Sequence, residues 1–249
     1  MNQPLLSAKN ITRRFGGLTA IDNVSIDLHR GAVHSVIGTN GAGKSTLVSI
    51  LSGELPPNEG KIFLKQKEVT DWPQPKRARA GMGRSYQRTT IFPTLTVHEN
   101  CRLAAQANHQ HFWSWTSSAS HCKHSNEAAD QALQLTGLSD YADRIAGLLS
   151  HGGKRQLEIA MGLATHPEVL LLDEPLAGMG SEETDRMLGL LDSLKHDHAI
   201  LLVEHDMDAV FRISDEITVM VNGAVIAHGT PEAIRNDPQV QTAYLGEEE

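Results

Sequence analysis

The stretch from Gly38 to Ser45, with the sequence GTNGAGKS, constrains this chain more than any other. It matches the phosphate-binding loop pattern G-x-x-x-x-G-K-S/T at every fixed position. The mostly apolar run Val33–Ile37 before it predicts a buried strand, and the run Ser45–Leu51 after it has apolar residues at helical spacing and stops at Gly53. A glycine-rich turn between strand and helix aims backbone N–H groups and the positive end of the helix at one concavity. The sequence therefore predicts a binding site for a nucleotide polyphosphate.

Each part of this loop has an expected role. Lys44 is expected to reach the β- and γ-phosphates, and the Ser45 hydroxyl to hold Mg²⁺. A chance match is the alternative, and the order of strand, loop and helix argues against it. The residues expected to contact the nucleotide here are Gly38, Thr39, Asn40, Gly41, Ala42, Gly43, Lys44, Ser45 and Thr46.

Composition limits the remaining possibilities. The chain has 249 residues, of which 40% are apolar, enough for one large domain with an inserted subdomain. Its net charge of −8 argues against a general nucleic-acid or anionic-membrane surface, so we expect no nucleic-acid partner. Eight Lys or Arg residues between 61 and 88 are interpreted as a solvated face. Two cysteines make no disulfide framework, and no apolar run is long enough to cross a membrane.

Two further apolar runs end in polar residues. Val169–Leu172 predicts a buried strand followed by Asp173 and Glu174. Because ligands of parallel α/β sheets lie at the carboxyl ends of the strands, we expect Asp173 beside the Mg²⁺ and Glu174 near the γ-phosphate. The strand Ala199–Val203 brings His205 to the same edge, although a core histidine is the alternative.

Other signals are weaker by themselves. Ser150 and Gly152 precede a predicted helix, Leu157–Ala164, where exposed N–H groups can contact an anion. Phe15 is either a ring that stacks on a base or a core residue. The segment 108–126 contains several histidines and Cys122 but no Cys-x₂-Cys or paired histidine spacing, so a polar surface loop is preferred over a zinc site.

Taken in order, these motifs resemble those of the ATP-binding subunits of ABC transporters. The set consists of the phosphate-binding loop, a Gln after a basic segment, Leu-Ser-x-Gly, apolar-Asp-Glu-Pro, and a His after the next strand. The resemblance covers nearly the whole chain. It implies an α/β P-loop ATPase domain over residues 5–237 with an antiparallel β subdomain, a helical subdomain inserted at about 88–161, and a C-terminal tail at 238–249.

The resemblance also implies roles for single residues in binding and hydrolysing ATP with Mg²⁺. Phe15 stacks on the adenine, and Gln87 senses Mg²⁺, water and the transmembrane partner. Glu174 polarises the attacking water, and His205 contacts the γ-phosphate. The expected catalytic residues are thus Lys44, Gln87, Glu174 and His205, and the expected Mg²⁺ ligands are Ser45, Gln87 and Asp173.

Ser150 and Gly152 belong to the signature motif, which in this family contacts ATP bound by a second subunit. A homo- or heterodimer is therefore implied. Gly153 stands where the signature usually has Gln, and Gly180 stands where a following loop often has Asp. The sequence alone does not decide how these two glycines affect the coupling between the two ATP sites.

Several segments are similar to importer subunits for branched-chain amino acids, amides and urea: residues 83–87, 92–100, 157–160 and 243–247. This similarity implies transmembrane permease partners, a periplasmic solute-binding protein and a peripheral location at the cytoplasmic face of the inner membrane. The alternatives are an exporter ATPase for lipid or polysaccharide, a soluble ABC ATPase without a transport role, and a non-catalytic regulatory subunit.

Overall fold

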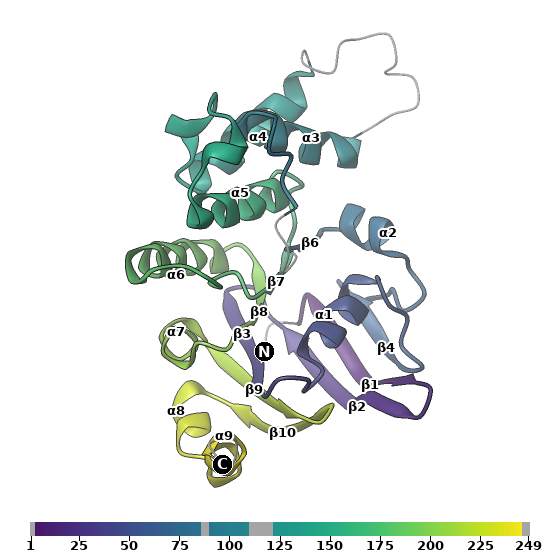
Figure 1. Ribbon diagram of the computed structural model, residues 1–249. Coiled ribbons are helices and arrows are strands. Elements are labelled where there is room, and N and C mark those ends of the chain that lie inside the picture. Colours follow the sequence, from purple (N-terminus) through teal and green to yellow (C-terminus); the bar gives the residue numbers. More distant parts are fainter. Residues whose placement is uncertain (1–2, 86–89, 110–121, 246–249) are drawn as a thin grey trace.

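The computed structural model describes residues 3–85, 90–109 and 122–245 (Figure 1). Two sheets and a separate group of helices make up this part of the chain. The expected α/β P-loop fold with an antiparallel β subdomain and an inserted helical subdomain is confirmed. No helix among the described residues is long and apolar enough to span a bilayer.

The larger sheet has six strands in the order β10-β9-β3-β8-β7-β6. Strand β3 pairs in parallel with β8 and β9, and β7 pairs in parallel with β6 and β8, so these strands end at one edge of the sheet. Every residue of β7 and β8 is buried, which explains their unbroken apolar sequences. The strands are β3 (Ala32–Gly38), β6 (Met82–Arg84), β7 (Val169–Asp173), β8 (Ala199–Val203), β9 (Glu216–Val221) and β10 (Ala224–Gly229).

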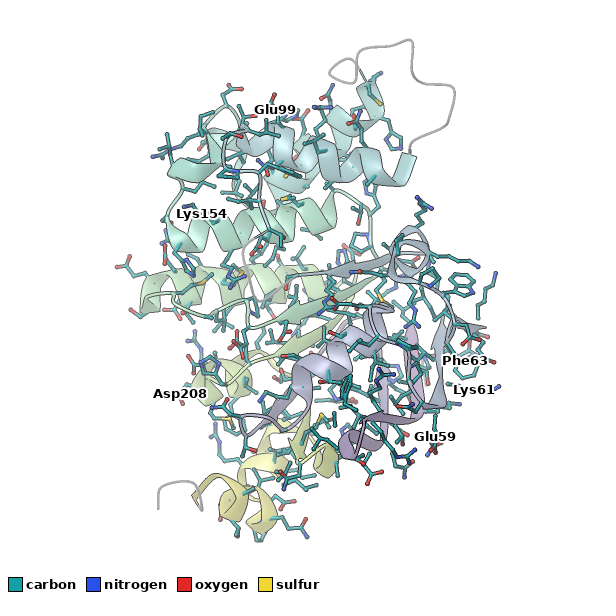
Figure 2. All side chains as sticks on the ribbon, turned by 45° about the vertical axis from the view of Figure 1, so that its right-hand side comes forward. Glu59, Lys61, Phe63, Glu99, Lys154 and Asp208 are labelled. Carbon is teal, nitrogen blue, oxygen red and sulfur yellow. The ribbon has the colours of Figure 1, made fainter. Side chains whose placement is uncertain are left out.

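The smaller sheet is antiparallel, with the order β2-β1-β4-β5. Ile62 and Leu64 of β4 are buried, whereas Figure 2 shows Glu59, Lys61 and Phe63 of the same strand on the outer side of the molecule. Helix α1 (Lys44–Ser52) buries its apolar side in the core that both sheets share. The strands are β1 (Leu6–Phe15), β2 (Leu18–Leu28), β4 (Glu59–Leu64) and β5 (Lys67–Glu68).

Helices α3 (Val97–His109), α4 (Lys123–Leu135) and α5 (His151–Leu163) lie together at the top of Figure 1. Their buried side chains belong to the same hydrophobic cluster as Leu172 of β7 and Leu202 of β8, which attaches the helical group to the larger sheet. Short 3₁₀ turns, η3 (Ser139–Tyr141) and η4 (Ala146–Leu148), connect α4 to α5.

The remaining helices are α2 (Gln74–Arg79), α6 (Ser181–Lys195), α7 (Met207–Ile213), α8 (Pro231–Arg235) and α9 (Pro238–Leu245). Asn222 and Gly223 between two apolar runs predict a hairpin, and the structure confirms it: they join β9 to β10 with φ of 49° and 83°, as a type I′ turn requires. The pair Thr230-Pro231 predicts a helix start capped by Thr230, and this cap is present in α8, since Thr230 Oγ1 accepts a hydrogen bond from the Ala233 N–H. Within the expected C-terminal tail, α9 buries Val240.

Three expectations about local structure were wrong. Helix α5 begins at His151 rather than at Leu157, because the Ser150 hydroxyl caps it by accepting a hydrogen bond from the Gly153 N–H at 3.1 Å. The apolar spacing of Ala128, Ala132 and Leu135 predicts a helix that begins at Glu127, but α4 begins four residues earlier, at Lys123. The basic segment is not wholly a solvated face, because Arg77 is only 1% exposed.

Arg77 instead binds the end of α1. Its guanidinium donates to the carbonyl oxygens of Ile50 and Leu51 at 2.9 and 2.7 Å, and to Thr70 O at 2.8 Å. Ile50 and Leu51 lie in the last turn of α1, where the helix supplies no N–H four residues further on, so the buried cation is a partner for their carbonyl oxygens. Burial lowers the pKa of Arg77 to about 10, which leaves it charged at neutral pH. Arg77 therefore fixes the helix that carries the phosphate-binding loop.

Candidate active site

The phosphate-binding loop connects β3 to α1 and is pressed against two neighbouring strands. A Cβ atom on Gly38 would lie 2.0 Å from the Met220 carbonyl oxygen, and one on Gly43 would lie 2.5 Å from that of Ala20. Both glycines have positive φ, 152° and 99°. Only glycine fits these positions, so the loop follows one path and presents its backbone to the cavity.

Lys44 is the first residue of α1, and its ammonium group lies over the loop. Nζ donates to Gly38 O at 2.6 Å and to Thr39 O at 3.0 Å. The first turn of α1 has no acidic residue, so nothing in that turn offsets the positive helix end. This end of the helix is therefore prepared for an anion.

A cavity of about 710 Å³ surrounds the loop. It brings together distant parts of the chain: the β1–β2 turn, the loop, the residue after β7, and the β9–β10 turn. Phe15 is 43% exposed at its rim, and the Arg13 guanidinium lies 4.6 Å from its ring centroid. The lining residues are Phe15, Leu18, Thr19, Ala20, Asn40, Gly41, Ala42, Gly43, Lys44, Ser45, Thr46, Glu174, Asn222 and Gly223.

Ser45 lines this cavity, and Asp173 lies beside Ser45. Ser45 Oγ is 3.5 Å from Asp173 Oδ1, and Asp173 is 3% exposed. Burial, followed by the charge of Glu174, raises the pKa of Asp173. A hydroxyl and a carboxylate are hard oxygen donors of the kind that Mg²⁺ prefers, so these two residues fit that ion. No group of three or more His, Cys, Asp or Glu side chains in the described residues has metal-binding geometry.

Glu174 and His205 follow neighbouring strands, β7 and β8, at the same edge of the sheet. Glu174 has a positive φ of 51°. The His205 side chain is 65% exposed and lies beside Glu204, whose Oε2 is 3.8 Å from His205 Nδ1.

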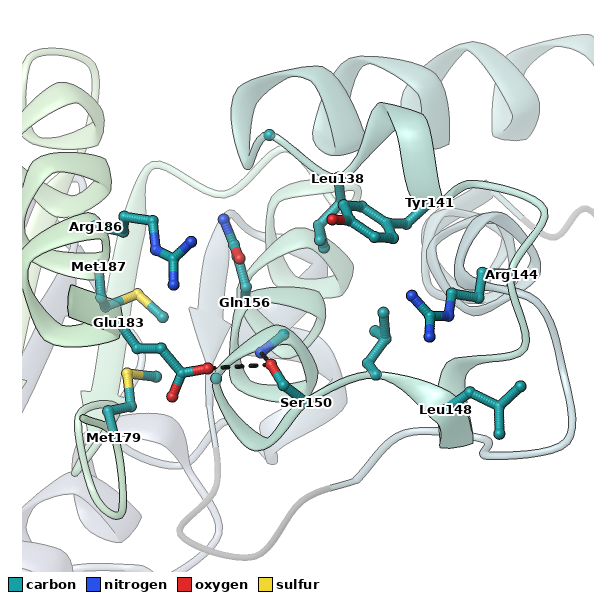
Figure 3. A pocket seen from close by; sticks show the side chains of 14 residues that line it. Leu138, Tyr141, Arg144, Leu148, Ser150, Gln156, Met179, Glu183, Arg186 and Met187 are labelled. Carbon is teal, nitrogen blue, oxygen red and sulfur yellow. Dashed lines mark hydrogen bonds between the residues drawn. The ribbon is translucent and has the colours of Figure 1, made fainter. Parts of the chain in front are cut away.

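Ser150 and Gly152 are not brought to this cavity. They line a second one, of about 650 Å³, between α5, α6 and the η3 and η4 turns (Figure 3). Ser150 Oγ donates to Glu183 Oε1 at 3.1 Å, and a Cβ atom on Gly152 would lie 2.6 Å from the Glu183 carboxyl carbon. The start of α5 is thus covered by a carboxylate from α6.

Two expected features lie outside the described residues: Gln87, and residues 110–121 of the histidine-rich segment. Some residues of the site were not singled out from the sequence. Ser85 Oγ accepts the Asp173 N–H at 3.2 Å, Glu183 binds Ser150, and Asn222 and Gly223 line the first cavity. Glu204 follows β8 as Glu174 follows β7, and that parallel was the signal available for it.

The chain matches two family models. The model described as "ABC transporter" matches residues 21–177, and the one described as "Branched-chain amino acid ATP-binding cassette transporter" matches residues 224–249. The second match covers β10, α8 and α9.

Similar proteins cover almost the full length. The chain is 42% identical to the high-affinity branched-chain amino acid transport ATP-binding protein LivG of Escherichia coli K12, over 99% of this chain and all of LivG. It is 41% identical to BraF of Pseudomonas aeruginosa, also a high-affinity branched-chain amino acid transport ATP-binding protein, with the same coverage. The ADP conformation of MJ1267, an ATP-binding cassette of an ABC transporter, superposes with a TM-score of 0.87 at 30% identity, over 98% of this chain and 100% of that one.

Proposed function

This chain belongs to the ABC transporter family of ATP-binding proteins, and we propose that it hydrolyses ATP to drive the import of branched-chain amino acids. The observation that carries the catalytic part is a single cavity lined by the phosphate-binding loop, Lys44, Phe15 and Glu174. The C-terminal family match and the relatives named for branched-chain amino acid transport support the substrate class.

In the proposed mechanism the chain first positions the nucleotide. Phe15 stacks on the adenine at the rim, and the N–H groups of the loop hold the phosphates. The Lys44 ammonium group leaves the carbonyl oxygens of Gly38 and Thr39 and binds the β- and γ-phosphates instead. Ser45, Asp173 and Gln87 would hold Mg²⁺, which neutralises phosphate charge.

Hydrolysis then depends on the residues that follow β7 and β8. Glu174 orients the attacking water and accepts its proton, while His205 contacts the γ-phosphate. Asp173 serves the metal rather than the water, because it lies beside Ser45.

Ser150 and Gly152 line a cavity of their own, so we propose that they contact ATP held by a second ATP-binding subunit. Dimer closure around ATP would drive the transmembrane permeases, and a periplasmic solute-binding protein would deliver the amino acid. The chain would then act at the cytoplasmic face of the inner membrane as a peripheral subunit.

ATP hydrolysis by Glu174→Gln tests the catalytic part. With Mg²⁺, we expect wild type to hydrolyse ATP and Glu174→Gln to lose about 100-fold or more in kcat while still binding ATP, because a general base contributes that much. Glu182→Gln, which removes one exposed carboxylate of α6, is the control. Wild-type activity in Glu174→Gln would contradict the proposal.

Uptake of leucine, isoleucine and valine tests the substrate. The chain would be reconstituted with its permeases and binding protein in vesicles loaded with ATP. We expect ATP-dependent uptake of these amino acids and none of urea. Uptake of urea without that of leucine would overturn the substrate while leaving the catalytic proposal intact.

A further inference from the structure

Glu204 is a buried carboxylate to which no expected role was given. It is the first residue after β8 and is only 1% exposed. A carboxylate in such a place is costly unless hydrogen bonds compensate for the lost water. Its hydrogen-bond partners therefore indicate why it is there.

Each oxygen of Glu204 accepts a backbone N–H from a different turn. Oε1 accepts the Leu176 N–H at 2.8 Å, and Oε2 accepts the His205 N–H at 3.3 Å. Leu176 lies two residues after Glu174, in the turn that follows β7. One side chain thus joins the turn that carries Glu174 to the turn that carries His205.

The turn after β7 needs this support. Glu174 has a φ of 51°, a left-handed conformation that a residue with a Cβ keeps only when its surroundings hold it. Its own N–H donates to Val203 O at 2.9 Å. The turn is therefore attached to the end of β8 twice, at Val203 directly and at Glu204 through the Leu176 N–H.

Glu204 also contributes charge. Burial raises the pKa of Glu204, and the charge of Glu174 raises it further. The two N–H donors and the charge of His205 lower this pKa. A change at Glu204 alters both the backbone and the field at Glu174.

We propose that Glu204 is a positioning residue for ATP hydrolysis, which holds Glu174 and His205 in a fixed relation at the γ-phosphate end of the cavity. The inference rests on the proposed function, in which Glu174 orients the water. Glu204 itself is buried behind the two turns and does not line the cavity.

The variant Glu204→Gln tests this role. Glutamine keeps the shape and one acceptor oxygen but turns an amide N–H toward the second backbone N–H, so one hydrogen bond is lost. We expect kcat to fall about tenfold, the loss of one charge-assisted hydrogen bond, while KM for ATP changes less than about twofold. KM is expected to hold because the phosphate-binding loop is untouched.

Asp215→Asn is the matched control. Asp215 Oδ2 accepts the Val33 N–H at 2.8 Å, near the opposite end of β3 from the loop. The change from carboxylate to carboxamide at Asp215 is expected to leave kcat within about twofold of wild type, since it moves neither the turn that carries Glu174 nor the turn that carries His205. All assays run below the lowest melting temperature of the set, measured for each variant.

The outcomes separate the two proposals. If Glu174→Gln hydrolyses ATP like wild type, the proposed function falls and the role of Glu204 with it. If Glu174→Gln is inactive while Glu204→Gln matches Asp215→Asn in kcat, only the positioning role is overturned. Should Glu204→Gln not fold, Glu204→Asp decides by the same readout, because it keeps the charge but is too short to reach both N–H groups.

Discussion

Helices α1 and α5 both begin beside glycines, yet their starts differ in charge. Lys44 lies over the start of α1, whose first turn has no acidic residue. The start of α5 is capped by Ser150 and covered by the carboxylate of Glu183. The two helix starts both contain glycines, but their surroundings differ. The N-terminus of α1 faces a lysine and can accept an anion, whereas the N-terminus of α5 already contacts the Glu183 carboxylate.

This difference has a consequence for assembly. Under the proposed function, the α1 site takes phosphates in a single subunit, whereas the α5 site must release Glu183 before it receives the γ-phosphate of ATP bound by a partner. Two anions at one helix end repel each other, so the release costs free energy. The following predictions test this contrast.

Lys44→Ala is expected to have the largest effect. Removing the cation that faces the phosphates should weaken ATP binding roughly a thousandfold, about 4 kcal/mol, as for breaking a buried charge pair. Lys154→Ala, in the first turn of α5 (Figure 2), should change the affinity of the isolated chain less than about twofold. Titration with a fluorescent ATP analogue measures both; similar losses would show that the two helix starts are alike.

Acidic pH should lower the free energy of unfolding through His34, which lies in β3, the strand that leads to the phosphate-binding loop and α1. His34 of β3 is 3% exposed, with Nε2 2.8 Å from Thr218 Oγ1, and its pKa is lowered to about 4 by burial and by His228. His29 also lowers it, while Asp27, and Glu216 at 3.4 Å from Nδ1, favour the charged form.

The sign follows from the lowered pKa. The folded state keeps His34 neutral, so the stability it contributes is complete above pH 6.5 and is lost as pH falls toward 4. The loss amounts to about 3 kcal/mol. Denaturant unfolding of wild type and His34→Gln across this range measures it. Equal pH dependence in the two proteins would contradict the prediction.

Glu183→Gln should have the smallest effect and act only on the α5 side. The substitution keeps the shape of the side chain beside Ser150 and Gly152 but removes its negative charge, so the side chain no longer repels an incoming phosphate. In a Glu174→Gln background we expect ATP-dependent dimers to form about tenfold more tightly, which is about 1.4 kcal/mol. Light scattering against Glu182→Gln in the same background measures this. An unchanged or weaker dimer would mean that Glu183 supports the site rather than blocking it.

Parts of the site could be read from the sequence because they are local. The loop residues, the strand before them and the carboxylates after β7 lie within single short segments, where strand and turn signals are strong. The start of α5 was missed because glycines argue against a helix, while the Ser150 cap and packing against α3 and α4 outweigh their low propensity. The boundaries of the inserted subdomain at about 88 and 161 stay a prediction.

The sequence by itself determined the phosphate-binding loop with its flanking strand and helix, and the order of the motifs, since glycines, apolar periods and turn residues act over a few positions. The two-sheet architecture followed from the resemblance that this order of motifs carries. Only the tertiary structure decided which distant groups meet: Phe15 with the loop, Glu183 with Ser150, Glu204 with Leu176. Those contacts depend on how parallel strands align at one edge and how α6 packs beside α5. Burial then gives each buried carboxylate hydrogen-bond partners that no single segment contains.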